Sequence, residues 1–570
     1  MQNFKKNVSE KILEVIKTSF SEVDIEAHQL ADMLEYPPDT TMGDLALPCF
    51  KLSKSLRRSP IQIAQIIADE FSDESVKKVE AVNGYLNISV SDNHLAKIVL
   101  DNILPNGNKY GSANFGEGKT VVLDYSSPNV AKPFHIGHLG TTVIGHSLKK
   151  LHEFVGYNCV GINYLGDWGT QFGKMIVAFK KWGNRDTINE GGIDKLVELY
   201  VKFHQAAEED PSLNDKARAE FHKLELGDEE NITLWKWFID ISIAEYKKTY
   251  GQLGIEFDSY KGESFYTDKM PAQVEKLREM GLLKIDDGAS IVDLEEYNMP
   301  PCLILKRDGS TLYPTRDIAA AVYRKQTYDF DKAIYVTSAG QSLHFAQWFK
   351  VVELMGYEWY DKLVHVPYGT VSINGAKLAT RTGNVILLKD LFDQAIEKVA
   401  EIMDEKNPNL ENKEKVAEAV GVGAIVFYYL SSNRIRDINF VLEDALSFDG
   451  NTGPYVQYTY ARTCSLLEKA GSFSNNAHMN FTADEERELV KTLSRFPEKV
   501  LEALEAYEPS IITRYILDVA TSFNRFYHNC HILSAQDEDV FNTRLVLTKA
   551  ANYVLGNAFE LICLKKTEKI

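Results

Sequence analysis

Four short apolar runs, each followed by turn residues and then by a helical pattern, constrain the fold of this chain more than any other feature. They occupy residues 120–125, 158–165, 332–339 and 363–368. Short apolar strands that alternate with helices are typical of a parallel sheet covered on both faces, because such strands are buried on either side. The sequence therefore predicts an α/β domain at about 118–390.

The whole chain has 570 residues, which is too long for one hydrophobic core, so further domains are expected. Residues 1–110 carry a helical segment and a strand-like run, which predict an α+β N-terminal domain. A charged, helix-rich stretch at about 180–265 is interpreted as an insertion within the α/β domain. The fold class is thus multidomain α/β.

The strand pattern vanishes from about residue 416 onward. We expect a connecting helical region at 391–445 and an all-α bundle at 446–570. The bundle is indicated by three helical patterns, at 455–469, 485–507 and 509–527.

The net charge disfavours nucleic-acid binding without excluding it. The chain has 63 lysines and arginines against 81 aspartates and glutamates, a formal net charge of −18. Phosphate contacts dominate nucleic-acid affinity, so an acidic chain needs its cations gathered on one face. Lys51, Lys54 and Arg58 recur at helical spacing and are candidates for such a face, although a solvated helix surface has the same pattern.

Six cysteines lie scattered with no close pair, which argues against a compact disulfide framework and against a local zinc site. They are interpreted as reduced thiols. No apolar run approaches the ~18 residues of a membrane span, and we identify no signal peptide. An intracellular protein without a membrane partner is therefore expected.

The strongest chemical signal is the stretch Asp124-Tyr-Ser-Ser-Pro-Asn-Val-Ala-Lys-Pro-Phe-His-Ile-Gly-His138. Pro133 suits a helix entry, and His135 and His138 would then stand one turn apart on the same helix face. A helix that begins after a parallel strand presents free N–H groups to anions such as ATP phosphates. Gly137 would let a purine approach the backbone, and the imidazoles can donate hydrogen bonds to phosphate oxygens. The alternative is two structural histidines near a helix start.

In this stretch the chain resembles the class I aminoacyl-tRNA synthetases, whose first signature reads His-Ile-Gly-His. Residues 126–139 are similar to arginyl-tRNA synthetases in particular. Further blocks that resemble this family occur along nearly the whole chain: 43–58, 84–88, 163–171, 227–230, 262–266 and 453–462. The resemblance implies a Rossmann-like catalytic domain, an N-terminal tRNA-binding domain and a helical anticodon-binding domain.

The resemblance also implies a reaction. Such an enzyme activates L-arginine with ATP to arginyl-adenylate and passes arginine to the 2′-hydroxyl of the terminal adenosine of tRNA(Arg), in protein synthesis. Magnesium is expected within the ATP complex, without a permanent metal site. The family further implies a cytoplasmic enzyme, mostly a monomer, that activates arginine efficiently only with tRNA bound.

The family's second signature is a mobile Lys-Met-Ser-Lys-Ser loop that clamps the triphosphate, and it matches Lys377-Leu-Ala-Thr-Arg-Thr-Gly383. Lys377 and Arg381 keep two cations one short loop apart, as the transition-state charge requires. Ala379 replaces the motif's serine, and Lys132 resembles the lysine thought to compensate for such departures in arginyl enzymes. Which of the three cations dominates stays open, and Lys377 could equally be a solvated surface lysine.

Specificity for arginine calls for an acidic partner, because a carboxylate meets the planar guanidinium best in a bidentate fork. Tyr313 and Asp317 are four residues apart and face the same way if a helix begins there. By resemblance these two read the side chain and Gln341 completes the pocket. The resemblance assigns the other end of the substrate to Asp124, Ser127 and Asn129. From the residues alone, an ion pair between Asp317 and adjacent Arg316 is the plainer interpretation.

Three alternatives are open. Another class I synthetase, such as the cysteinyl enzyme, would need a zinc cluster, and no suitable Cys/His grouping appears. A small nucleotidyltransferase also uses His-x-Gly-His, but it is usually a single domain. A tRNA-binding paralogue without catalysis is suggested only by the altered 377–382 loop.

A tRNA-binding function makes one further demand on the charge. Arg462, like the three cations at 51–58, is a candidate tRNA contact. We expect the acidic residues to lie away from a basic face that runs from 51–58 to the terminal bundle.

Overall fold

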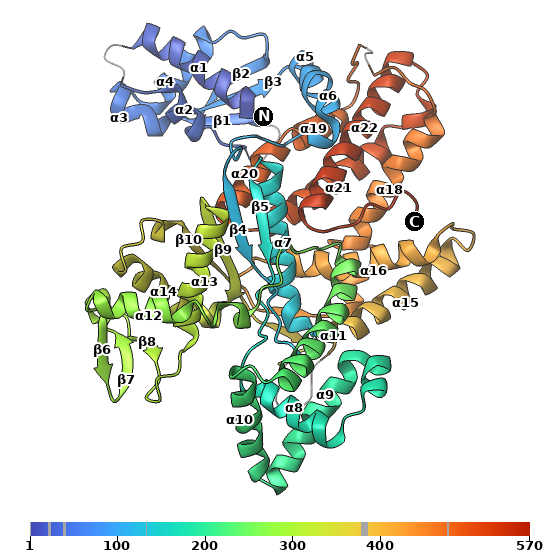
Figure 1. Ribbon diagram of the computed structural model, residues 1–570. Helices are drawn as coiled ribbons and strands as arrows, with labels where there is room; N and C mark the ends of the chain where they lie inside the picture. The colour runs from blue at the N-terminus through green and yellow to red at the C-terminus, as the bar shows by residue number, and fades with distance from the viewer. Residues whose placement is uncertain (1, 21–23, 38–41, 133, 378–385, 476–477) are drawn as a thin grey trace.

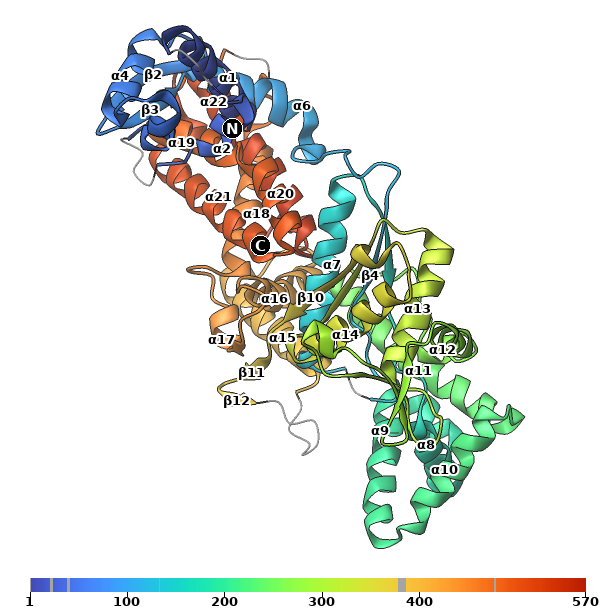
Figure 2. The ribbon, with the colours of Figure 1, turned by 90° about the vertical axis from the view of Figure 1, so that its left-hand side faces the viewer.

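The computed structural model describes residues 2–20, 24–37, 42–132, 134–377, 386–475 and 478–570. Figure 1 shows a central parallel sheet with a helical insertion below it and two further domains above it. The N-terminal domain and the C-terminal bundle lie side by side at that upper end, as the view turned by 90° confirms (Figure 2).

The four apolar runs form one parallel sheet, which confirms the central prediction. Its strands are β4 (Thr120–Asp124), β5 (Asn158–Ile162), β9 (Lys332–Ser338) and β10 (Leu363–Tyr368), in the order β10-β9-β4-β5. Val121 and Leu123 of β4 pack into one core together with α7 (Leu139–Phe154). Val122 packs into a second core together with α13 (Tyr313–Tyr328) and α14 (Ser342–Leu354). Burial on both faces explains why these strands are continuously apolar.

The N-terminal domain is α+β, as predicted. Its antiparallel sheet has the order β1-β3-β2, with β1 (Leu45–Pro48), β2 (Val76–Val82) and β3 (Tyr85–Val90). Its helices are α1 (Gln2–Ser19), α2 (Ala27–Met33), α3 (Ser53–Leu56) and α4 (Pro60–Glu70). Helix α5 (Asp92–Lys97), a π-helical turn at Ile98–Ile103 and α6 (Leu104–Asn106) lead to the catalytic domain.

The basic stretch at 51–58 does not form the continuous helix that its spacing predicts. A 3-10 turn (Cys49–Leu52) is followed by the single turn of α3, which ends at Arg57 in the left-handed conformation with φ 52°. Arg58 therefore lies beyond the helix and does not share a helix face with Lys51 and Lys54. Lys51 is also paired with Glu35, at 2.6 Å.

The insertion consists of long helices, α8 (Thr170–Trp182), α9 (Arg185–Glu209), α10 (Ser212–Glu225) and α11 (Glu229–Leu253). Asp228 caps the start of α11, and Gly254 ends it with φ 70°, a conformation that suits glycine. The chain then forms α12 (Met270–Glu279) and a small antiparallel sheet of β6 (Leu283–Asp286), β7 (Ala289–Val292) and β8 (Cys302–Leu305) before α13.

The C-terminal third is helical. It contains α15 (Leu388–Lys406), α16 (Lys413–Leu430), α17 (Leu442–Ala445), α18 (Gly453–Ala470), α19 (Asp484–Leu493), α20 (Phe496–Ala506), α21 (Ser510–Asn529) and α22 (Glu538–Leu561). The expected helix at 485–507 is two helices, because Pro497 starts α20 and cannot continue α19.

The prediction that strands vanish after residue 416 is wrong at one place. Strand β13 (Ile438–Phe440) pairs in parallel with β11 (Val371–Ile373), which also pairs with β12 (Ala376–Lys377). Three residues are too few to produce a recognisable alternation, and the partner strand lies more than sixty residues earlier in the chain.

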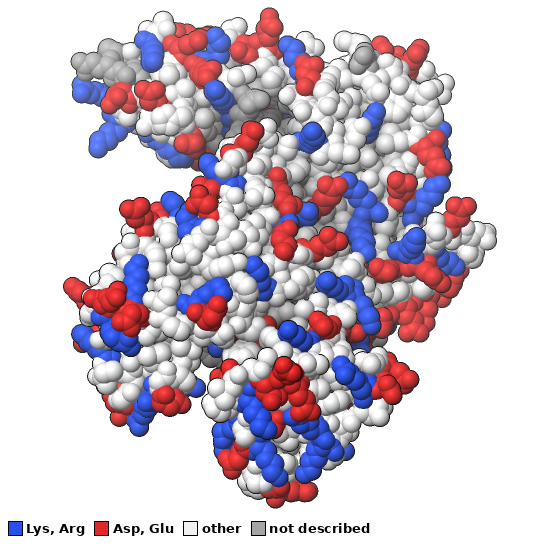
Figure 3. Space-filling model, in the orientation of Figure 1, with Lys and Arg blue, Asp and Glu red and all other residues white. Residues whose placement is uncertain are grey.

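Charges of both signs are interspersed over the face of the molecule in Figure 3, including its N-terminal domain. In that view the expected separation of acidic residues from one basic face is not seen. The N-terminal domain instead meets the bundle through oppositely charged pairs. Arg487 binds both carboxylate oxygens of Asp92 at 2.9 Å, and Lys491 lies 2.5 Å from Asp44.

Candidate active site

The first signature lies in the loop from β4 to α7. Ser126, Ser127 and Ala131 have φ angles of 71°, 48° and 59°, which non-glycine residues adopt at a cost of about 1–3 kcal/mol each. Such strain persists only where neighbours fix the backbone. Here the Ser126 amide donates to Thr141 Oγ1 at 3.0 Å, and the Ser127 amide donates to Asn163 Oδ1 at 3.2 Å.

Helix α11 of the insertion braces the same loop. The Tyr246 hydroxyl donates to the carbonyl oxygens of Asn129 and Lys132, both at 2.8 Å. The Tyr250 hydroxyl lies 2.7 Å from Ser126 Oγ, and the Ala131 amide donates to a serine hydroxyl of α11 at 3.1 Å. The insertion thus supports the strained loop, a role that its sequence pattern did not indicate.

The two signature histidines lie together, but not on one face of an α-helix as predicted. His135 is extended and precedes a 3-10 turn (Ile136–His138), and α7 begins only at Leu139. The Nδ1 atom of His135 accepts a hydrogen bond from the Gly137 amide at 3.1 Å. That of His138 accepts one from the His135 amide at 3.2 Å. The ring centroids are 3.9 Å apart.

Both imidazoles are neutral at physiological pH. Burial lowers the pKa of His138 to about 3, and nearby His135 adds to that effect. Burial and then Lys132 lower the pKa of His135. Because each Nδ1 atom accepts a backbone hydrogen bond, the proton of each neutral ring sits on Nε2. Among the described residues, no hydrogen bond engages either Nε2–H group, so each is available to donate to a phosphate oxygen.

The chain that follows the second signature lies beside the first signature. The Ile136 amide donates to the Ile386 carbonyl at 3.3 Å, and the Leu388 amide donates to the Phe134 carbonyl at 2.9 Å. The side chain of Lys377 and the whole of Arg381 lie outside the described residues.

A cleft of about 630 Å³ opens at the carboxyl end of β4 and β9. Its lining contains His138 and all of the predicted arginine contacts: Asp124, Ser127, Asn129, Tyr313, Asp317 and Gln341. Helix α13 begins at Tyr313, so Tyr313 and Asp317 share a helix face as predicted. His135, Gly137 and Lys132 are close to His138 in the sequence but are not part of the cleft lining.

Two of the carboxylates on this lining, Asp317 and Glu263, are each held by a different residue. His344 Nε2 lies 2.6 Å from Asp317 Oδ2. Arg316, the neighbour expected to compete for Asp317, instead pairs with Glu263, its Nη1 lying 2.7 Å from Glu263 Oε2. Burial raises the pKa of Glu263 to about 7; Arg316 opposes this rise, and the negative charge of Asp317 adds to it.

Asp124 is less open to a substrate than predicted. Its Oδ2 atom lies 2.7 Å from Nη2 of Arg324, and its Oδ1 atom accepts a hydrogen bond from Ser127 Oγ at 2.9 Å. The Arg324 guanidinium stacks over the rings of Tyr164 and Tyr335, at 5.1 and 5.7 Å. The Asp124–Arg324 pair closes the floor of the cleft.

Sequence reasoning missed Glu263, Arg324 and His344 as parts of this site. Glu263 lies within a block that resembles the family, at 262–266, and His344 lies three residues after Gln341. Arg324 gave a weaker signal, since it lies seven residues after Asp317, close to the same face of α13.

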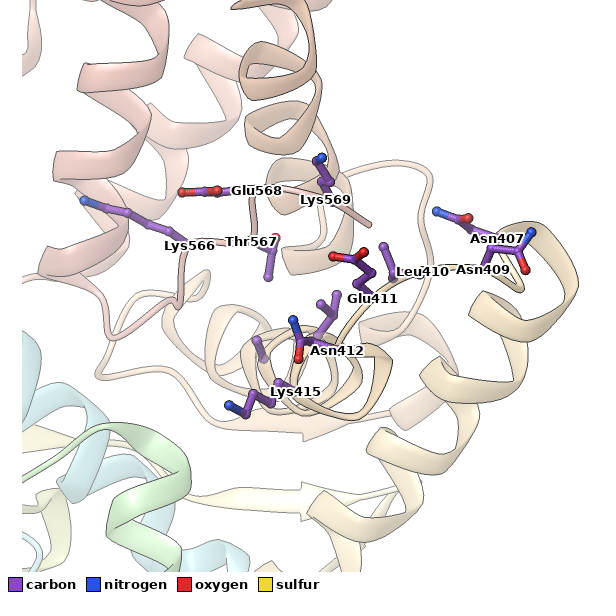
Figure 4. Close-up of a pocket in the computed structure, with 12 residues that line it drawn as sticks. Asn407, Asn409, Leu410, Glu411, Asn412, Lys415, Lys566, Thr567, Glu568 and Lys569 are labelled. Atoms are coloured by element: carbon purple, nitrogen blue, oxygen red, sulfur yellow. The ribbon is translucent and has the colours of Figure 1, made fainter. Parts of the chain in front are cut away.

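Arg462 belongs to a separate surface on the bundle. Its guanidinium lies between the rings of Tyr458 and Tyr527, at 5.0 and 4.6 Å, and it donates to Asn524. Beside it is a hollow of about 680 Å³, where residues 566–569 of the C-terminal tail cross the loop that joins α15 to α16 (Figure 4). Arg462 and Lys569 line an adjoining hollow.

Two properties of the described residues bear on metals and membranes. None of their His, Cys, Asp and Glu side chains form a group of three or more that is placed to hold a metal ion. None of the helices within the described ranges is long and apolar enough to cross a membrane.

Comparison with known proteins agrees with this geometry. Residues 99–442 match the family model of the class I (R) tRNA synthetase catalytic domain. Residues 3–90 match the arginyl tRNA synthetase N terminal domain, and residues 456–570 match the DALR anticodon binding domain.

Relatives match over the full length. The chain is 50% identical to an arginine–tRNA ligase of Alkaliphilus metalliredigens and 49% identical to one of Clostridium perfringens, with all of each chain covered. The arginyl-tRNA synthetase structures of Thermus thermophilus and Plasmodium falciparum share its fold, with TM-scores of 0.82 and 0.79. Both are 24% identical and cover at least 99% of each chain. With its catalytic and both flanking domains matched in order, the chain belongs to the class I arginyl-tRNA synthetase family.

Proposed function

We propose that the chain joins L-arginine to tRNA(Arg) at the expense of ATP. In the first step the arginine carboxylate attacks the α-phosphorus of Mg-ATP and pyrophosphate leaves. In the second step the 2′-hydroxyl of the terminal adenosine attacks the adenylate and AMP leaves. The observation that carries this proposal is a cleft at the carboxyl edge of a parallel sheet whose lining contains three acidic residues, Asp124, Glu263 and Asp317, and the neutral His138.

ATP activation is assigned to the first signature. The Nε2–H groups of His135 and His138 donate to phosphate oxygens as negative charge grows at the α-phosphorus. Gly137 leaves the backbone open to the purine. Lys132, Lys377 and Arg381 supply cations for the pyrophosphate, and Mg²⁺ enters as part of the ATP complex rather than as a resident metal.

The guanidinium is assigned to two carboxylates instead of one bidentate fork. Within the described residues, His344 holds one oxygen of Asp317 and Arg316 holds one oxygen of Glu263, which leaves the other oxygen of each carboxylate for the substrate. Tyr313 and Gln341 complete this end of the pocket. The α-amino and carboxylate end is assigned to the residues after β4: Asp124, Ser127 and Asn129.

The domains on either side of the catalytic core are assigned to tRNA. We place its anticodon side on the bundle at 446–570, where Arg462 and two tyrosines form a cationic, aromatic surface suited to stacked bases. Residues 1–110 bind another part of the tRNA, with Lys54 and Arg58 as exposed phosphate contacts. Lys51 contributes less, because Glu35 already neutralises it.

We further propose a cytoplasmic monomer. Free thiols at all six cysteines support a reducing compartment. The monomer rests on the family resemblance, and sedimentation velocity would test it.

Aminoacylation with labelled arginine tests the reaction. The enzyme should charge tRNA(Arg) that ends in 3′-deoxyadenosine and should fail with tRNA that ends in 2′-deoxyadenosine. The opposite preference would contradict the 2′-hydroxyl. If arginine is not attached to either of these tRNAs or to unmodified tRNA(Arg), the proposed function fails.

A further inference from the structure

We propose that His344 is a positioning residue for arginine recognition. It holds one oxygen of Asp317 and so directs the other oxygen at the substrate guanidinium. This inference deepens the proposed function and rests on its assignment of Asp317 to the arginine side chain.

The contact joins two elements that are far apart in the sequence. Asp317 lies in the second turn of α13 and His344 lies in the first turn of α14, and the two helices pack on the same face of the sheet. Their side chains are 20% and 27% exposed, and both line the cleft. The 2.6 Å contact between Nε2 and Oδ2 is short, as expected for a hydrogen bond to a carboxylate.

This hydrogen bond limits a rotation that is otherwise free. The terminal torsion of an aspartate side chain has a broad distribution, so an unheld carboxylate samples many orientations. In the described part of the chain, His344 is the one hydrogen-bond partner of the Asp317 carboxylate. Removing it would leave the carboxylate in place but without a fixed direction.

The surroundings favour a fixed His344 ring. Phe345 packs edge-on against it at 5.4 Å and stacks flat on His365 at 4.4 Å. Thr337, which lines the cleft, lies 2.8 Å from His365 Nε2. The imidazole therefore packs against Phe345, which is itself held by His365, while its Nε2 atom faces Asp317.

The same arrangement recurs at the second carboxylate. Glu263 has one oxygen held by Arg316 and, in the described residues, no hydrogen bond to its other oxygen. Two oxygens from separate residues suit a planar guanidinium, which offers donors along two edges. A compact lysine ammonium cannot reach both in the same way. Fixing each carboxylate through its own partner, His344 or Arg316, would thus set the specificity for arginine.

The test uses pyrophosphate exchange with saturating tRNA. His344→Leu should raise the Michaelis constant for arginine about ten- to a hundredfold, because a hydrogen bond to a charged group is lost. The kcat and the Michaelis constant for ATP should change less than about twofold, which a general folding defect would not reproduce. His222→Leu is the matched control, since His222 also faces a carboxylate, Glu225, at 3.7 Å but lies on the insertion surface.

Two conservative variants keep the test decisive if His344→Leu folds poorly. Glutamine can place an amide N–H near the Nε2 position, so His344→Gln should recover most of the arginine affinity. Asparagine is one carbon shorter, so His344→Asn should lose it. Equal affinities in these two variants would overturn the proposal.

A double-mutant cycle separates this inference from the proposed function. In an Asp317→Asn background, His344→Leu should change the Michaelis constant for arginine less than about twofold. If Asp317→Asn weakens arginine binding but His344→Leu does not, the positioning role is wrong and the proposed function stands. If Asp317→Asn leaves arginine binding unchanged, the assignment of Asp317 to the arginine side chain is wrong, and the positioning role of His344 is wrong as well.

Discussion

The active-site cleft and the seam between the N-terminal domain and the bundle each contain an arginine–aspartate pair, and these two pairs, Asp124–Arg324 and Asp92–Arg487, are buried to different degrees. The side chains of Asp124 and Arg324 are 9% and 1% exposed, whereas those of Asp92 and Arg487 are 40% and 21% exposed. When a buried pair loses one partner, the remaining charge stays uncompensated. When an exposed pair loses one partner, water solvates the remaining charge. The Asp124–Arg324 pair is thus suited to a fixed geometry, and the Asp92–Arg487 pair to an attachment that salt weakens.

The largest effect is expected from breaking the buried pair. Arg324→Met should lower the free energy of unfolding by about 3–5 kcal/mol, because Asp124 stays buried without its cation. Urea denaturation followed by circular dichroism measures this loss. A loss below about 1 kcal/mol would show that this buried pair stabilises the protein no more than the Asp92–Arg487 pair at the seam.

Removal of the guanidinium reader should have the next largest effect. Asp317→Ala should lower arginine-dependent kcat/KM roughly a hundredfold, because the substrate loses a charged hydrogen-bond partner. ATP binding, measured by equilibrium titration, should survive. Near-normal arginine activation in this variant would contradict the assignment of Asp317 to the arginine side chain.

Arginine affinity should depend on pH through Glu263. Its pKa of about 7 in the empty cleft means that it gains a proton as the pH falls below 7, and the neutral acid no longer attracts guanidinium. The affinity is therefore complete above this pKa and is lost below it. The Michaelis constant for arginine should rise about tenfold from pH 8 to pH 6.

A matched variant isolates the group responsible. Glu263→Gln should bind arginine more weakly at pH 8 and show little change between pH 8 and pH 6. A pH profile in this variant that follows the wild type would assign the titration to another group.

The smallest effect is expected at the seam. Arg487→Met, the same change as in the cleft, should lower the free energy of unfolding by at most about 1 kcal/mol, because this pair is partly solvated. Added salt should shrink the difference from the wild type further. An effect as large as that of Arg324→Met would show that the Asp92–Arg487 and Asp124–Arg324 pairs do not differ in their contribution to stability.

Local patterns in the sequence predicted the parts of the site that depend on local structure. The strand at 120–124 is apolar on both faces, and Tyr313 and Asp317 are one helical turn apart. These features follow from the periodicity of strands and helices.

Contacts between distant segments were not predictable in the same way. His344 and Glu263 are far from Asp317 and Arg316 in the sequence and meet them only in the folded domain. Strand β13 is too short to be recognised without its partner. The expected helix face at 51–58 failed because Arg57 takes a left-handed conformation that ends α3, and Ser59 and Pro60 then begin α4.

The most direct test of the central claim is ATP–pyrophosphate exchange across a panel of amino acids, with and without tRNA. The predicted result is exchange that depends on arginine, ignores lysine, citrulline and cysteine, and becomes efficient only with tRNA(Arg) present. Exchange with cysteine, or with no amino acid at all, would contradict the reading of this cleft as an arginine site.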